Sequence, residues 1–173
     1  AARAFLEMGY VRTGIDTIAR DAGVSTRTLY RLFSAKADLL KKAMEARIDA
    51  AFGSLDNATR AAGGSPQASL EALLSGYANL ALSDEAVRLT RLIAAERQEV
   101  PTLVESYRQA TSRITGAFEE WIVAQQKSGF LRPGDPQMAA HLLRGTINEA
   151  QRQILLGLRG PLTVAEQQDW VKA

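Results

Sequence analysis

Two arginines and three hydroxyl-bearing residues within six positions carry the most informative chemistry in this sequence. Arg27 and Arg31 are four residues apart and would share one face of a helix, with Thr28 and Tyr30 flanking them and Thr26 at the N-terminal tip. Guanidinium groups and threonine hydroxyls can bond to base edges in the DNA major groove, while a tyrosine hydroxyl and positive charge suit phosphates. The spacing therefore predicts a nucleic-acid-binding face.

Two short helices joined by a turn would position this face. Apolar residues at 15, 18, 19 and 22 follow the spacing of a helix buried on one side, and Thr13 just upstream is a candidate cap. Gly23 can adopt the left-handed conformation that ends a helix. Val24 is expected to fill the corner, and Ser25 is a good N-cap for a second helix that starts near Thr26.

The inner side of the second helix is expected to pack on the first. Leu29, Leu32 and Phe33 share one side, opposite the arginine pair. A following helix is predicted from Lys36 to about Phe52, which places Lys36 for a phosphate contact. This arrangement is typical of a helix-turn-helix. An ordinary helical hairpin with a solvated arginine face is the alternative for this pair of helices taken alone.

The longer stretch from Phe5 to Leu40 resembles the N-terminal DNA-binding domain of the tetracycline-repressor (TetR) family. Several independent positions at fixed spacing carry the resemblance: Phe5, Leu6, Gly9, Tyr10, Ile18, Ala19, Gly23, Val24, Ser25, Leu29, Tyr30, Phe33, Lys36, Leu39 and Leu40. The resemblance implies base contacts from Thr26, Arg27 and Thr28, and phosphate contacts from Tyr30, Lys36 and the helix start around Thr13. The full candidate DNA-binding set is Thr13, Ser25, Thr26, Arg27, Thr28, Tyr30, Arg31 and Lys36.

Two positions depart from the family pattern. Gly14 stands where relatives often have Ser or Thr, so a hydroxyl-to-phosphate bond is missing there or replaced by the Gly14 backbone. Arg31 stands where His or Tyr is frequent, and its contact with a base or with a phosphate stays open.

Charge is shared unevenly along the 173 residues. Residues 1–47 hold nine Lys and Arg against five Asp and Glu, a balance of +4, whereas residues 48–173 hold twelve against fourteen, a balance of −2. A polyanionic partner is thus expected for the first part only. The absence of Cys is compatible with a reducing cytoplasm, where we expect the protein to reside. The chain begins without Met inside the expected first helix, so we expect the native N-terminus to be missing.

The rest of the sequence is predicted to be helical, which gives an all-α protein of about nine helices. Helices are expected from Pro66 to about Leu82, from Ser83, from Pro101 to about Ser128, and from Pro136 to about Leu156. Thr163 and Glu166 form a capping box for a last short helix that holds Trp170. We expect residues 1–47 to form the DNA-binding domain and residues 48–173 a helical effector-binding and dimerisation domain.

The TetR resemblance implies a homodimer through the helices at about 136–157 and 163–172. Ala139, Leu142, Leu143, Thr146, Ile147, Ala150 and Ile154, with Gly145, form a stripe that suits close helix packing, or that faces the protein's own core. A dimer would bind a palindromic operator at half-sites about 34–36 Å apart. A small-molecule effector in the C-terminal domain is expected to release it, with repression favoured over activation. Tyr77, Tyr107, Phe118 and Trp121 are either walls of that effector site or plain core.

An enzyme is the second class of function considered. The sequence has one His, no Cys, no HExxH or GxSxG pattern and no phosphate-binding Gly loop, so we expect no catalytic residues, no cofactor and no metal site. A third class is a helical protein-interaction module that has lost DNA binding, for which Gly14 and the missing N-terminus argue. The interpretation favoured by the residues is a sequence-specific DNA-binding regulator.

Overall fold

A computed structural model describes the backbone of residues 1–61 and 65–172, and within them all side chains except those of residues 47, 48, 51, 52, 54–61, 110, 164, 170 and 172. The described chain contains nine α-helices and no strand, which confirms the predicted all-α class. No helix in these residues combines the length and the apolarity needed to cross a membrane.

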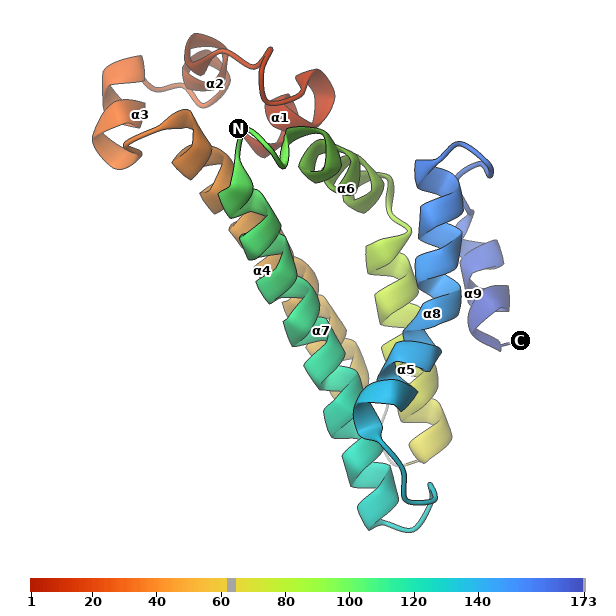
Figure 1. The fold of residues 1–173 in the computed structure, drawn as a ribbon. Helices are drawn as coiled ribbons and strands as arrows, with labels where there is room; N and C mark the ends of the chain where they lie inside the picture. Colours follow the sequence, from red (N-terminus) through yellow and green to blue (C-terminus); the bar gives the residue numbers. More distant parts are fainter. Residues whose placement is uncertain (62–64, 173) are drawn as a thin grey trace.

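Three short helices gather at one end of the molecule and form a head: α1 (Ala2–Met8), α2 (Ile15–Asp21) and α3 (Thr26–Leu32) (Figure 1). Phe5 of α1, Ile18 of α2 and Leu29 of α3 are buried together with Leu40 from the next helix. Gly9 ends α1 with φ +82°, a left-handed conformation that Gly adopts without steric cost. The short helices of the head therefore pack on an apolar core that α4 helps to form.

Helix α4 (Lys36–Ala61) leads from the head along α7 (Pro101–Lys127), and the two pack side by side (Figure 1). The expected end near Phe52 was wrong, because the helix continues for nine further residues. Gly53 is the only helix-breaking residue between positions 36 and 61, and a single Gly inside a helix costs only about 1 kcal/mol relative to Ala. The longer α4 spans the expected domain boundary at residues 47 and 48.

The body consists of α5 (Pro66–Ala81), α6 (Asp84–Glu96), α7, α8 (Pro136–Leu155) and α9 (Val164–Lys172). Side-chain caps start these helices where the sequence predicts them: Ser65, Ser83 and Asp135 each accept a hydrogen bond from a backbone N–H of the first turn. At α9 the Thr163 N–H donates to Glu166 Oε2 (2.7 Å) and the Glu166 N–H to Thr163 Oγ1 (3.3 Å), which confirms the capping box. The side chain of Trp170 lies outside the described residues.

Helix α6 and the start of α7 belong to the core of the head as well as to the body. Leu89, Leu92 and Ile93 of α6 are buried with Val100 and Leu103 in the same cluster as Phe5 and Ile18. In Figure 1, α6 lies directly beside α1, between the head and the remaining body helices. A displacement of α6 would therefore change the packing of the head core.

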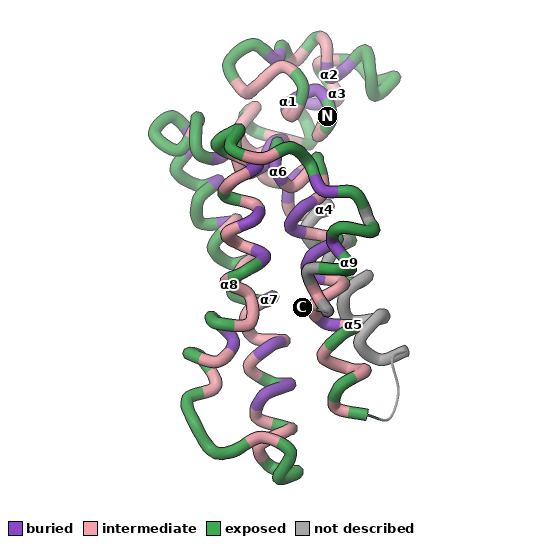
Figure 2. Tube along the Cα trace, turned by 90° about the vertical axis from the view of Figure 1, so that its right-hand side faces the viewer, coloured by how far each residue is buried: buried purple, intermediate pink, exposed green. Residues whose placement is uncertain are grey.

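A second core holds the body together. Tyr77 of α5 meets Phe118 of α7 edge to face, with ring centroids 5.7 Å apart, and Ile147 and Ile154 of α8 are buried in the same cluster. Buried residues recur along these helices between exposed ones, as Figure 2 shows. This pattern is that of amphipathic helices packed around a common centre.

Candidate nucleic-acid interface

The turn between α2 and α3 is fixed by backbone hydrogen bonds around Gly23. Its φ is +67°, its N–H donates to the Arg20 carbonyl (3.1 Å), and the N–H of Val24 donates to the Ala19 carbonyl (3.0 Å). These bonds close the end of α2 in the manner of a Schellman motif. The predicted left-handed Gly23 is confirmed.

Ser25 caps α3, as predicted. Its Oγ accepts a hydrogen bond from the Thr28 N–H (3.1 Å) and lies 2.9 Å from the Thr28 hydroxyl. The cap satisfies one backbone donor of the first turn and holds both hydroxyls at the N-terminus of the helix. The Ser25 cap thus fixes where α3 begins.

Leu29 anchors α3 to the head. Leu32 and Val24, which were also expected to be covered, are exposed. Leu29 is 6% exposed, but Leu32 is 64% and Val24 is 40% exposed, so the expected packing of Leu32 on α2 and of Val24 into the corner was wrong. Helix α3 ends at Leu32 and the chain becomes extended at Phe33 (φ −134°, ψ 122°), which leaves no further turn to cover Leu32. The corner is closed by the backbone bonds of Gly23 and Val24.

The outer face of α3 is polar and exposed. Arg27, Tyr30 and Arg31 are exposed, Thr26 and Thr28 are half-buried, and the segment from 20 to 35 is mostly exposed in Figure 2. Within the part of the chain that the structure describes, neither arginine has a hydrogen-bond or ion-pair partner. Their guanidinium donors are therefore free for an external acceptor.

Thr13 lies behind this face rather than on it. Its side chain is 0% exposed, and its hydroxyl lies 2.6 Å from the Gly9 carbonyl and 3.2 Å from the Ala4 carbonyl. Gly14 is the N-cap of α2 and offers no side-chain bond, so the expected Thr13 cap was wrong. Thr13 ties the start of α2 to α1, because the fold of α1 brings two carbonyls to its hydroxyl.

Lys36 begins α4 beside an aromatic ring. Its Nζ lies 4.5 Å from the centroid of Tyr10 and donates to the Val11 carbonyl (3.3 Å), while Tyr10 stacks on Phe5. Burial lowers the pKa of Lys36, and the charge of Glu96 opposes that shift. An ammonium group has three donors, so Lys36 is positioned by these contacts and keeps donors for a phosphate.

An open groove of about 590 Å³ extends the basic surface from α3 to α4. Arg31 lines it together with Lys41 and Lys42, two cations outside the predicted DNA-binding set. Lys42 Nζ is 2.8 Å from Glu45 Oε2. The signal for them was a pair of adjacent lysines five and six residues after Lys36, a pattern that is common on solvated helices.

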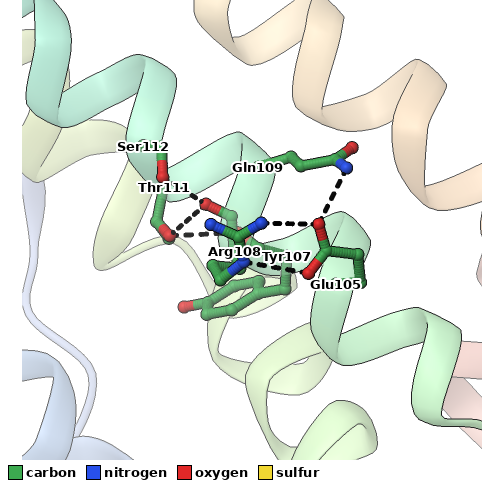
Figure 3. A network of polar contacts seen from close by, with 6 residues as sticks. All are labelled: Glu105, Tyr107, Arg108, Gln109, Thr111 and Ser112. Atoms are coloured by element: carbon green, nitrogen blue, oxygen red, sulfur yellow. Dashed lines mark hydrogen bonds and ion pairs between the residues drawn. The ribbon is translucent and has the colours of Figure 1, made fainter.

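The candidate aromatic residues of the body differ in how far they are buried. Phe118 is 0% and Trp121 is 9% exposed, and both belong to the body core. Tyr107 is half-buried, and Figure 3 shows its ring on the opposite side of α7 from Gln109, with Glu105 bonded to Arg108 and Gln109 at the surface. Tyr77 belongs to the body core as well, and Tyr107 packs against the core of the head, while the effector-site alternative stays a prediction.

Two family models match the chain. The model of the bacterial regulatory proteins of the tetR family matches residues 1–43, and the model of the C-terminal domain of AefR-like transcriptional repressors matches residues 68–173. Among curated proteins, none matches the chain.

Solved structures share this fold over nearly the whole chain. A protein from Mesorhizobium loti assigned to the TetR-family transcriptional regulators has a TM-score of 0.88 at 21% identity, over 98% of this chain and 86% of that chain. The regulator FadR from Bacillus subtilis, in complex with stearoyl-CoA, has a TM-score of 0.72 at 19% identity, over 99% and 92%. A protein from Saccharomonospora viridis assigned as a transcriptional regulator, in complex with choline, has a TM-score of 0.79 at 22% identity, over 99% and 88%.

Proposed function

The chain belongs to the tetR family of bacterial regulatory proteins, and from this premise we propose that it is a repressor that binds a palindromic operator as a homodimer and is released by a small-molecule effector. The observation that carries the proposal is the outer face of α3, where Arg27, Tyr30 and Arg31 are exposed on a helix that Ser25 and Leu29 hold in place. This face has the donors that major-groove recognition requires.

The proposed contacts divide into two kinds. Thr26, Arg27 and Thr28 at the start of α3 bind base edges, because the N-terminal residues of a recognition helix reach deepest into the groove. Tyr30, Lys36 and the Ser25 hydroxyl bind phosphates, and Arg31 joins Lys41 and Lys42 along the groove between α3 and α4. At the start of α2 a phosphate contact falls to backbone N–H groups, since the Thr13 hydroxyl is engaged inside the head.

We place the DNA-binding domain in residues 1–47 and the effector-binding and dimerisation domain in residues 48–173. The two family models fall on either side of this division, at residues 1–43 and 68–173. Helix α4 crosses the division, and α6 contributes to the core of the head, so the two domains are coupled by packing.

We propose that the homodimer forms through α8 and α9, and exposed apolar residues on α8 and directly after it support the part that α8 forms. Met138 and Leu142 on α8 are 57% and 67% exposed, and Leu156 is 62% exposed. Gly145 lies between them with no neighbouring atom within 4 Å of an added Cβ, so it leaves room for a second helix. A two-fold pairing would cover these residues and place two α3 helices on successive half-sites.

An effector in the body would act by favouring one spacing of the two α3 helices. The stearoyl-CoA and choline complexes among the similar structures support a ligand site in this fold. A ligand regulates only through a difference in its affinity for the two conformations, and a shift from 1:99 to 99:1 needs about 5.5 kcal/mol.

Binding to DNA at varied salt concentration tests the proposal. The DNA flanking the protein's own coding region is titrated with protein while the salt concentration is raised. A specific binder with several phosphate contacts should lose affinity steeply, with the logarithm of the binding constant falling linearly with the logarithm of salt. Absence of specific binding at any salt concentration would instead favour a helical protein-interaction module.

A further inference from the structure

Arg144 of α8 is a half-buried positive charge that contacts α7 and α5 and has no negative partner among the described residues. Its Nη1 donates to the Thr115 hydroxyl of α7, and its Cζ lies 5.2 Å from the centroid of the Tyr77 ring of α5. Its Nε is buried and has no hydrogen-bond partner, alone among the buried side-chain nitrogen and oxygen atoms that the structure describes. None of the ion pairs between described residues involves Arg144.

The groups that contact Arg144, Thr115 and Tyr77, are polar but neutral, and further neutral hydroxyls lie on the same helices and on α6. The Tyr77 hydroxyl donates to Asn148 Oδ1 of α8, and the Thr90 hydroxyl of α6 lies 3.5 Å from the Tyr107 hydroxyl of α7. Thr111 and Thr115 add two more half-buried hydroxyls along α7. In Figure 3 the Thr111 hydroxyl bonds back to backbone carbonyls of α7. No group of this set can neutralise a guanidinium.

An uncompensated cation in such a place is unfavourable in the unliganded protein. Arg144 as a whole is half-buried, but its Nε is buried, and a buried N–H without an acceptor loses its hydration without replacement. Arg differs from Lys in presenting Nε–H and an Nη–H in one plane, a fork that matches the two oxygens of a carboxylate. With Nη1 on Thr115, the Nε edge of that fork is the side left for a ligand.

We propose that Arg144 binds the anionic group of the effector, and that this group is a carboxylate. The inference rests on the proposed function, since it assigns the chemical class of the molecule that the body would bind. The neutral hydroxyls of Tyr77, Tyr107, Thr90 and Thr111 would surround the rest of the ligand's polar end. Thr90 lies on α6, which also packs into the head, so the ligand would touch the helix that connects the two cores.

Ligand binding without DNA tests the inference directly. The full chain is titrated by calorimetry with four acids, butyrate, octanoate, benzoate and phenylacetate, and with the primary amide of each. The amides have the same shape without the charge. We expect at least one acid to bind about ten- to hundred-fold more tightly than its amide, the range for a charged hydrogen-bonded pair. If no acid binds more tightly than its amide, the inference is overturned.

Substitution of Arg144 is the second test of the carboxylate site. Arg144→Gln should weaken the acid about ten- to hundred-fold and leave the amide unchanged, while Arg144→Lys should recover part of the loss. Arg108→Gln is the matched control, because Arg108 pairs with Glu105 on the outer side of α7. Equal effects of Arg144→Gln and Arg108→Gln would overturn the inference. If Arg144→Gln fails to fold, the comparison of acid with amide in the unmodified protein decides whether the site prefers a carboxylate.

The same ligands added to the protein–DNA complex separate this inference from the proposed function. An acid that binds through Arg144 but never releases DNA supports the carboxylate site and contradicts the effector part of the proposed function. Release of DNA by acid and amide alike, unchanged in Arg144→Gln, supports the proposed function and overturns the carboxylate site.

Discussion

Arg91 of α6 caps the end of α8: its Nη2 donates a hydrogen bond to the carbonyl of Ile154 at 3.0 Å. The same guanidinium also lies within hydrogen-bond distance of the Leu155 carbonyl. The last carbonyls of a helix have no partner within the helix, and a cation there also interacts favourably with the helix dipole. Since α6 packs into the core of the head, Arg91 connects the proposed dimerisation helix to the DNA-binding end of the molecule.

Replacing Arg91 should therefore loosen this connection. Arg91→Met keeps much of the apolar stem but removes the bonds to α8, and we expect it to lower the free energy of unfolding by about 1–2 kcal/mol, measured by urea denaturation. Arg88→Met is the control on the same helix, because Arg88 pairs with exposed Asp84 (2.7 Å), a kind of pair worth about 0–1 kcal/mol. Equal losses in the two variants would contradict a special role for Arg91.

The two leucines of α3 should respond very differently to truncation. Leu29→Ala removes a buried anchor of the head and is expected to cost about 2–4 kcal/mol and to abolish DNA binding. Leu32→Ala should change the stability by less than about 0.5 kcal/mol, because that side chain is exposed. Urea denaturation followed by circular dichroism measures both. A large loss of stability in Leu32→Ala would mean that Leu32 packs in solution.

A comparison of Arg27→Ala with Lys36→Ala should distinguish a base contact from a phosphate contact. If Arg27 binds a base, its removal should reduce discrimination among operator variants by about 1–3 kcal/mol. Lys36→Ala should weaken all sequences about equally and reduce the salt dependence by about one phosphate contact. Fluorescence anisotropy with labelled operators at several salt concentrations measures both quantities. If Lys36→Ala reduces discrimination among operators and Arg27→Ala weakens all sequences equally, then Lys36 contacts a base and Arg27 a phosphate.

Local signals predicted most of the fold. Ser25, Ser65, Ser83 and Asp135 act as caps at the predicted helix starts, because a cap bonds to a backbone N–H only two or three residues away. Helical periodicity was less informative in α3, which has seven residues. In two turns of helix, spacing alone cannot tell whether Leu29 and Leu32 are both covered, since the covering residues come from α1, α2 and α4.

Contacts between residues far apart in the sequence could not be predicted from the sequence. Arg91 reaches a carbonyl 63 positions away, and Arg144 reaches a hydroxyl 29 positions away. Nothing in the neighbourhood of either arginine distinguishes it from a solvated one. Thr13 shows the same limit at short range, because a Thr before a helix is typical of an N-cap and only the fold of α1 brings the Gly9 carbonyl to its hydroxyl.

The proposed dimer predicts a specific effect of charge on α8. Leu142→Glu places a carboxylate in the centre of the proposed interface, where burial of an unpaired charge is strongly unfavourable, so the protein should become monomeric. Val104→Glu on α7 is the matched control, since Val104 is 43% exposed and lies outside that interface. Sedimentation equilibrium distinguishes the two states. A dimer that persists in Leu142→Glu would contradict the assignment of α8.

The alkaline stability of the protein should depend on Tyr77. Burial raises the pKa of its hydroxyl above the ordinary value of 10.0, and the nearby charge of Arg144 only partly opposes that shift. The stabilising effect of the neutral, buried hydroxyl is fully present below pH 10 and is lost as the pH rises through the raised value, because the unfolded chain releases this proton first. Tyr77→Phe should cost about 1 kcal/mol near neutral pH, since Asn148 loses its donor, and should flatten the decline of stability above about pH 10. Urea denaturation across that range measures the slope, with exposed Tyr30→Phe as the control that keeps it. A decline of equal slope in Tyr77→Phe would show that other groups, among them Tyr10, whose pKa burial also raises, set the alkaline limit.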